Sequence, residues 1–95
     1  MIYTVVFSLT AIETFDAIKF QIQERFGNKI VAEFEERTLK VLETLSLSPE
    51  IFQSLKQAPH IRKGFIHKNC AMFYQVKATQ IEILFFWDNR QEPIL

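Results

Sequence analysis

Residues 61–93 read IRKGFIHKNCAMFYQVKATQIEILFFWDNRQEP, and this stretch decides the fold. Three segments of it, 61–67, 70–76 and 80–87, are rich in apolar and aromatic residues and short enough to be strands. Lys68-Asn69 and Ala78-Thr79 separate these segments where tight turns are needed. Because strands joined by two-residue turns pair antiparallel, the stretch predicts a three-stranded antiparallel meander.

One strand and two helices are expected before the meander. Residues 2–7 (IYTVVF) are rich in β-branched and aromatic residues and predict a strand. Ser8 or Thr10 is expected to cap a first helix, with Glu13 completing a capping box with Thr10. That helix ends at Gly27, and Asn28 is expected to cap a second helix that stops near Ser48. The order β-α-α-β-β-β predicts an α+β fold, with a helical hairpin packed on a mainly antiparallel sheet.

Apolar residues at helical spacing define the expected core. The first helix has its stripe at Ile12, Phe15, Lys19, Ile22 and Phe26, beside Ile18, and the second at Ile30, Phe34, Val41 and Leu45, flanked by Val31, Thr38 and Leu42. Leu9, Phe20 and Leu39 project away from these stripes. They are either isolated exposed side chains or, with Ile51 and Phe52, a groove for a partner segment.

The last strand is apolar on both sides. Strict alternation places Ile81, Ile83, Phe85 and Trp87 on one face and Leu84 and Phe86 on the other. A central strand buried on both sides accounts for this pattern.

Length and composition indicate one small domain, residues 1–95, with an apolar fraction of 48% that is ample for a core. Cys70 is the single cysteine, so no internal disulfide forms and a reducing, cytoplasmic compartment is expected. The N-terminus has no basic leader, and no apolar stretch is long enough to span a membrane.

Charge is unevenly distributed on a chain whose formal net charge is zero. Residues 1–50 sum to −3, residues 51–81 to +5 and residues 82–95 to −2. The basic segment contains Lys56, Arg62, Lys63, Lys68 and Lys77. It fits either a local anionic partner or a set of lysines that solvate one sheet edge and its turns.

Several motifs resemble a known family. Arg62 opens the second strand, Phe73-Tyr74-Gln75-Val76 lies in the third, and Asp88, Arg90 and Pro93 follow the last as Asp-x-Arg-x-x-Pro. In this element order they resemble the RelE/ParE superfamily of bacterial toxins from type II toxin–antitoxin modules. The resemblance covers nearly the whole chain, and the closing FFWDNRQEP is most similar to the ParE-type branch, often labelled plasmid stabilisation proteins.

The resemblance implies a cytosolic toxin of the ParE type that inhibits DNA gyrase and growth and is neutralised by a cognate antitoxin. One alternative is a RelE-like endonuclease that cleaves messenger RNA on the ribosome. Another is a non-toxic, protein-binding member of the fold. RelE-type nucleases resemble one another in an arginine early in the third strand and usually a His or Tyr near the C-terminus. This chain has Cys-Ala-Met at 70–72 and neither His nor Tyr after Trp87, which argues against an enzyme.

Candidate site residues follow for each alternative. The nuclease candidates are Arg62, Lys63, His67 and Tyr74, and alternation places Lys63 and His67 on one face of their strand and Arg62 on the other. The partner-binding candidates are Leu9, Phe20, Leu39, Ile51, Phe52, Lys56, Arg62 and Arg90. Arg90 also has a structural interpretation, as an arginine forked onto a nearby carboxylate. No spacing indicates a metal or a cofactor, and the pattern leaves the oligomeric state open.

Overall fold

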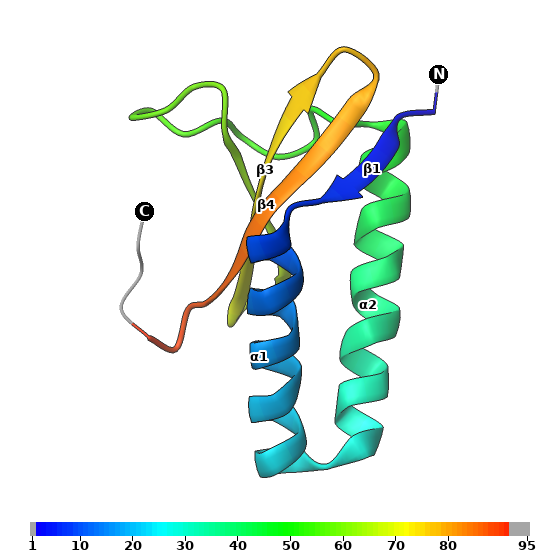
Figure 1. Ribbon diagram of the computed structural model, residues 1–95, viewed down its shortest axis with the longest axis vertical. Coiled ribbons are helices and arrows are strands. Elements are labelled where there is room, and N and C mark those ends of the chain that lie inside the picture. Colours follow the sequence, from blue (N-terminus) through cyan, green and yellow to red (C-terminus); the bar gives the residue numbers. More distant parts are fainter. Residues whose placement is uncertain (1, 92–95) are drawn as a thin grey trace.

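The structure is a computed structural model that describes residues 2–91. It has two layers, a helical hairpin and a sheet (Figure 1). The elements in chain order are β1 (Thr4–Phe7), α1 (Leu9–Phe26), α2 (Asn28–Leu47), β2 (Arg62–His67), β3 (Cys70–Lys77) and β4 (Gln80–Asp88). This order confirms the predicted β-α-α-β-β-β fold. Pro93, the last residue of the Asp-x-Arg-x-x-Pro motif, lies outside the described residues.

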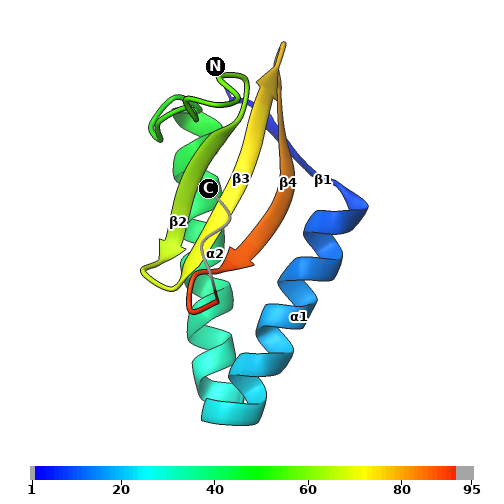
Figure 2. The same ribbon diagram turned by 90° about the vertical axis from the view of Figure 1, so that its left-hand side faces the viewer.

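The sheet has the strand order β1-β4-β3-β2. Strands β2, β3 and β4 pair antiparallel, which confirms the meander, and β1 pairs parallel with β4 (Figure 2). Ala78, in the turn between β3 and β4, has a φ of 52°, the left-handed conformation that two-residue hairpin turns require. The chain therefore places its first strand at one edge and its second strand at the other.

Ser8 and Gly27 fix the two ends of α1. Ser8 is the N-cap, and its Oγ accepts a hydrogen bond from the Ala11 N–H at 3.0 Å. The capping box predicted for Thr10 and Glu13 is wrong, because α1 begins at Leu9 and Thr10 already lies in its first turn. Gly27, with a φ of 86°, ends α1 and precedes α2, a backbone conformation that favours glycine.

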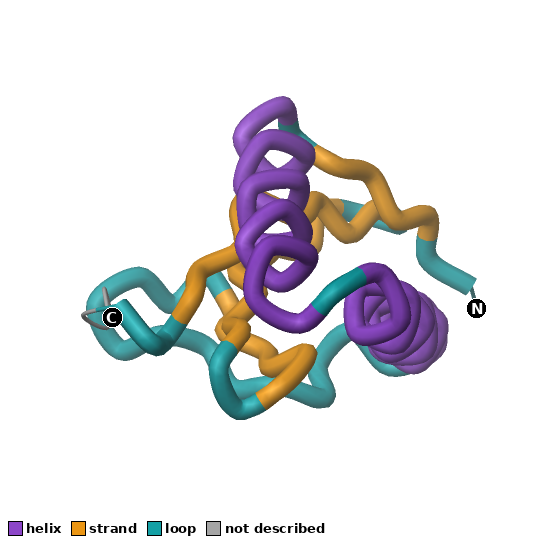
Figure 3. Tube along the Cα trace, turned by 90° about the horizontal axis from the view of Figure 1, so that it is seen from below, coloured by secondary structure: helices purple, strands orange, loops and turns teal. Residues whose placement is uncertain are grey.

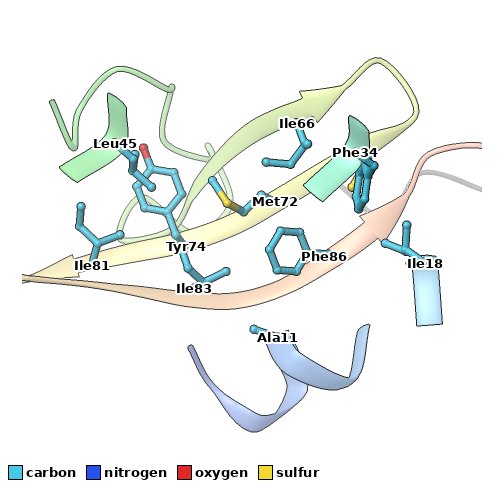
Figure 4. Close-up of a cluster of buried hydrophobic side chains, with 11 residues drawn as sticks. Ala11, Ile18, Phe34, Leu45, Ile66, Met72, Tyr74, Ile81, Ile83 and Phe86 are labelled. Atoms are coloured by element: carbon cyan, nitrogen blue, oxygen red, sulfur yellow. The ribbon is translucent and has the colours of Figure 1, made fainter. Parts of the chain in front are cut away.

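Figure 3 shows the two helices and the strands from below. The core fills the space between the hairpin and one face of the sheet (Figure 4). Its buried members include Ala11, Ile18, Phe34, Leu45, Ile66, Met72, Tyr74, Ile81, Ile83 and Phe86. The stripe predicted on α1 is wrong in part. The buried residues of α1 are Ala11 and Ile18, whereas Ile12 and Phe26, which belong to the predicted stripe, are 49% and 58% exposed. The buried face of α1 is therefore narrower than the apolar pattern of its sequence.

A β-bulge at Leu84 overturns the predicted faces of β4. Phe73 pairs with Phe85 and Tyr74 with Ile83, so one residue of β4 has no partner on β3. As a result Phe86 joins Ile81 and Ile83 in the core (Figure 4). Phe85 turns to the opposite face, where it stacks on Phe73. Helix α1 stabilises the bulge, because Ser8 Oγ donates to the Leu84 carbonyl at 2.7 Å and Thr14 Oγ1 accepts from the Phe86 N–H at 2.9 Å.

Candidate functional site

The sheet face turned away from the helices is lined with aromatic rings. Phe73 stacks on Phe85 with ring centroids 4.5 Å apart, and Phe65 is 47% exposed. Ala71 pairs with both Phe65 and Trp87, which places all three on this face. The Nζ of Lys63 lies 5.4 Å from the Phe65 centroid and 5.7 Å from that of Phe73. We call this set, Lys63, Phe65, Ala71, Phe73, Phe85 and Trp87, the aromatic face.

Two of the nuclease candidates have structural contacts on the other side of the sheet. Tyr74 is buried, and its hydroxyl donates to the Pro49 carbonyl at 2.8 Å. Burial raises the pKa of the Tyr74 phenol above its ordinary value. Arg62 pairs with Tyr74, and its Nη1 donates to the Phe52 carbonyl at 2.7 Å. Through these two hydrogen bonds, both side chains hold the connector between α2 and β2 against the sheet.

His67 lies on the helix side of the sheet, which corrects the prediction that it shares a face with Lys63. Ile66 lies in the core, as alternation with Gly64 requires, and a register shift between Phe65 and His67 then turns His67 to the same side, where it pairs with Cys70. His67 Nδ1 accepts the Asn69 N–H at 3.2 Å, so the proton of the neutral ring is assigned to Nε2. Burial lowers the His67 pKa, and the cations Arg37, Lys68 and Arg90 lower it further.

A pocket of about 220 Å³ opens between the tip of the helical hairpin and the ends of β2 and β4. We call it the hairpin–sheet pocket. Its apolar wall consists of Ile18, Ile22, Phe26, Ile30 and Phe34, and its other lining residues are Glu33, Arg37, His67, Asn69, Cys70, Asp88 and Arg90. From their helical spacing, the residues of the apolar wall were predicted to lie in the core. Arg37 was not among the candidate site residues.

Asp88 and Arg90 form a forked ion pair at one side of this pocket. Arg90 Nε donates to both carboxylate oxygens, at 3.0 and 3.2 Å, and Arg90 Nη2 donates to Oδ2 at 2.7 Å. The Arg90 side chain is 30% exposed and that of Asp88 is 9% exposed. This pairing confirms the structural interpretation of Arg90. Hydrogen bonds from Arg90 hold the pKa of the Asp88 carboxyl below its ordinary value.

The partner-binding candidates do not share one groove. Leu9, Phe20, Leu39 and Ile51 are 71%, 61%, 61% and 53% exposed, and Lys56 is exposed as well. Phe20 lines a shallow depression that also includes Arg90, whereas Leu39 lines a separate groove. Phe52 packs on the core, with its ring at a centroid distance of 6.4 Å from that of Tyr74.

The groove at Leu39 is lined mainly by apolar side chains. It has a volume of about 340 Å³ and runs between β1, α1 and α2. Its lining residues are Phe7, Ile12, Phe15, Asp16, Glu35, Thr38, Leu39 and Leu42, and we call it the helical groove. Phe7 and Ile12 are 41% and 49% exposed. The sequence missed this groove because Ile12 and Leu42 lie at core spacing on their helices.

Within residues 2–91, His, Cys, Asp and Glu side chains form no group of three that is arranged to hold a metal ion. Over the same range, neither helix is both long and apolar enough to cross a bilayer. Neither a protein-family model nor a curated protein sequence matches the chain.

Solved structures do match it over nearly its whole length. A chain of the chromosomal ParDE toxin–antitoxin system from P. aeruginosa aligns with a TM-score of 0.76 at 15% identity, over 92% of this chain and 96% of that chain. The chain has the RelE/ParE fold. A YoeB/ParE toxin from Agrobacterium tumefaciens aligns at 0.67 and 13% identity, over 90% and 96% of the two chains. The RelBE2 toxin–antitoxin complex from Mycobacterium tuberculosis gives 0.64 and 19%, over 93% and 99%.

The aromatic face is apolar where β3 begins. Position 71, early in β3, is Ala71, and its two cross-strand partners are Phe65 and Trp87. A ribonuclease requires cations around the scissile phosphate and a proton donor for the leaving oxygen. An apolar side chain flanked by two aromatic rings supplies neither group.

Proposed function

We propose that this chain is the toxin component of a type II toxin–antitoxin module, that it inhibits DNA gyrase in the cytoplasm in the manner of ParE, and that a cognate antitoxin neutralises it. The RelE/ParE fold supports the assignment to this class of module. The single observation that favours the gyrase branch is the aromatic face, which has Ala71 and Trp87 where cleavage chemistry needs charged and proton-transferring groups.

The positions of the nuclease candidates support the same choice. Arg62 and Tyr74 are engaged with backbone carbonyls, and His67 lies on the opposite side of the sheet from Lys63. A general base, a general acid and the cations that hold a phosphate must lie within hydrogen-bond reach of one substrate. These four side chains do not converge in that way.

The helical groove supports the proposed antitoxin partner. Its lining is largely apolar, and β1 beside it is an edge strand of the sheet. An amphipathic helix binds such grooves through apolar residues at helical spacing, and an edge strand accepts a further strand by main-chain hydrogen bonds. We therefore propose that the antitoxin segment binds along the groove and β1.

Purified gyrase tests the proposed target. The chain is added at micromolar concentration to a DNA supercoiling reaction, with a Trp87→Ala/Phe65→Ala variant as a probe of the aromatic face and Lys40→Ala, on the far helix, as the matched control. The expected result is loss of supercoiling with the wild type and Lys40→Ala. In parallel, induced expression in a bacterium is expected to stop growth. Unaffected growth together with unaffected supercoiling would reject the proposal.

Primer extension on translated messages after induction separates the nuclease alternative from the gyrase proposal. The gyrase proposal predicts no new cleavage sites. New sites that disappear in a Lys63→Ala/His67→Ala double variant would establish ribosome-dependent cleavage instead. Binding of an antitoxin without growth arrest would identify the third alternative, a non-toxic binding member of the fold.

A further inference from the structure

We propose that the hairpin–sheet pocket binds a carboxylate attached to an apolar body, such as an aryl-acetic acid or an acidic residue next to an aromatic one. This site is separate from the helical groove, since the two share no lining residue. It also lies on the opposite side of the sheet from the aromatic face. The inference therefore goes beyond the proposed toxin function and does not depend on it.

The apolar half of the site is a wall of the helical hairpin that the sheet does not cover. The tips of α1 and α2 extend past the ends of the strands, as Figures 1 and 2 show. At this tip Phe26 remains 58% exposed and Ile30 38% exposed, although both lie at core spacing. A ligand that covers these side chains removes apolar surface from water, which favours binding.

The polar half consists of donors at the end of β2, after the end of β4 and on α2 itself. His67 presents its Nε2–H, because its Nδ1 is occupied by the Asn69 N–H. Arg90 uses Nε and Nη2 on Asp88, which leaves Nη1 available. Arg37, on α2, makes no hydrogen bond and no ion pair within the described range 2–91. Three donor groups thus border one cavity.

The formal charges of the lining residues cancel, two acidic against two basic, so the preference for an anion over a cation rests on the charges that act on His67. The charged and titratable groups facing the pocket are Glu33 and Arg37 from α2, His67 and Cys70 beside the β2–β3 turn, and Asp88 and Arg90 at the end of β4. Asp88 is already satisfied by Arg90 and is nearly inaccessible. Arg37, Lys68 and Arg90 all act electrostatically on His67 in the same direction, so the potential at its ring is positive. A carboxylate is stabilised at that position.

The size of the cavity sets the class of ligand. A cavity of roughly 150 Å³ lined by apolar side chains is known to hold one benzene molecule. The hairpin–sheet pocket, at about 220 Å³, leaves room for one ring and a carboxylate. The pocket therefore suits phenylacetate or the side chains of a Phe-Asp pair better than a nucleotide or an extended lipid.

The test is an NMR titration of the full chain with phenylacetate and with its neutral isostere phenylacetamide. Amide shifts are expected at Ile22, Phe26, Asn69 and Arg90, with binding of the acid about tenfold or more tighter than that of the amide. The acid is also expected to raise the pKa of the His67 ring, because an anion beside it stabilises the imidazolium. Equal binding of acid and amide, or tighter binding of phenethylamine, would overturn the proposal.

Matched variants assign the two halves of the site. Arg37→Gln is expected to weaken phenylacetate binding by about tenfold, whereas Lys40→Gln, with the same charge change on the same helix, leaves it unchanged. Phe26→Ser is expected to weaken binding of both acid and amide, whereas Phe20→Ser does not. All four side chains are exposed, so these variants remain folded. If neither Arg37→Gln nor Phe26→Ser changes the affinity for phenylacetate, the proposed site is refuted.

A peptide arm identifies the source of the carboxylate. Acetyl-Phe-Asp-amide is titrated beside phenylacetate, with acetyl-Phe-Asn-amide as its neutral control. Tighter binding of the acidic peptide than of phenylacetate indicates a segment of a partner protein. Tighter binding of phenylacetate indicates a free organic acid, and in both cases the shared carboxylate chemistry is supported.

Discussion

The hydroxyl of Tyr74 donates a hydrogen bond to the carbonyl of Pro49, 2.8 Å away and 25 positions earlier in the chain. Arg62, opposite Tyr74 on β2, makes the corresponding bond to the carbonyl of Phe52. The connector between α2 and β2 has no helix or strand of its own, so side chains of the sheet satisfy its backbone acceptors. Two residues that a sequence motif suggests for catalysis thus have a structural role.

Tyr74→Phe is expected to lower the free energy of unfolding by about 1–2 kcal/mol, because the buried Pro49 carbonyl loses its donor. Urea denaturation followed by circular dichroism measures the change. Tyr3→Phe is the matched control, since Tyr3 packs on the core while its hydroxyl makes no hydrogen bond among residues 2–91, and its cost is expected to be near zero. Equal costs for the two variants would contradict this account of Tyr74.

Gly64→Ala is expected to destabilise the fold by about 1–3 kcal/mol through overpacking. A Cβ at Gly64 would lie 2.6 Å from Cδ2 of Phe52, whose ring is wedged between the sheet and the connector. The control is the same substitution in a Phe52→Ala background, where the ring is absent and the additional cost of Gly64→Ala becomes small. A full cost in both backgrounds would place the strain elsewhere.

Asp88→Asn is expected to cost about 2 kcal/mol at neutral pH, since it replaces a charge-assisted fork with weaker hydrogen bonds to Arg90. The folded pKa of Asp88 lies below its ordinary value of 3.8. Its stabilisation is therefore complete above that value and is lost as the pH falls through the folded pKa. Unfolding curves from pH 6 to pH 2 are expected to converge for the two proteins at the acid end, and a constant gap would rule out this linkage.

The order of elements could be predicted from the sequence because it depends on local signals. The turns at Lys68-Asn69 and Ala78-Thr79 and the break at Gly27 each mark a boundary through backbone chemistry within a few residues. The faces of the strands could not be predicted in the same way. The bulges at Leu84 and Ile66 leave no local signal, and the Leu84 bulge depends on Ser8 and Thr14, more than 70 positions away.

These bulges also explain which site residues the sequence missed. A shift of one residue reverses every later side chain of a strand. His67 and Asp88 thereby face the hairpin, beside Arg37, and this grouping forms the hairpin–sheet pocket. The exposed positions of Leu9, Phe20 and Leu39 were predicted correctly, since angular position on a helix is a local property, but their distribution over separate surfaces is not.

Cys70 is expected to be chemically inert in the folded protein. It is buried, and desolvation together with Asp88 raises the pKa of its thiol to about 12, so the reactive thiolate is scarce at pH 8. An aromatic disulfide reagent is expected to label one thiol per chain within minutes in strong denaturant and to react at the rate of unfolding without it. Rapid labelling of the native protein at pH 8 would disprove this expectation.

Under the proposed function, Leu39→Lys is expected to prevent binding of the antitoxin without loss of toxicity. Leu39 is 61% exposed and lines the helical groove, so a lysine costs little stability but places a charge where the proposed partner segment brings apolar side chains. The loss of affinity is expected to be at least about 30-fold, the equivalent of about 2 kcal/mol. Co-expression with the antitoxin and a pull-down of the complex measure the two effects.

Phe20→Lys is the matched control for this prediction. Phe20 is as exposed as Leu39 and lies on the same helical hairpin, but it lines a different surface, beside Arg90. Both variants introduce one lysine and remove a similar apolar area. Any difference in antitoxin binding between them is therefore due to the position of the substitution on the surface. If Phe20→Lys abolishes neutralisation and Leu39→Lys does not, the antitoxin follows the outer side of α1 and the helical groove has no part in its binding.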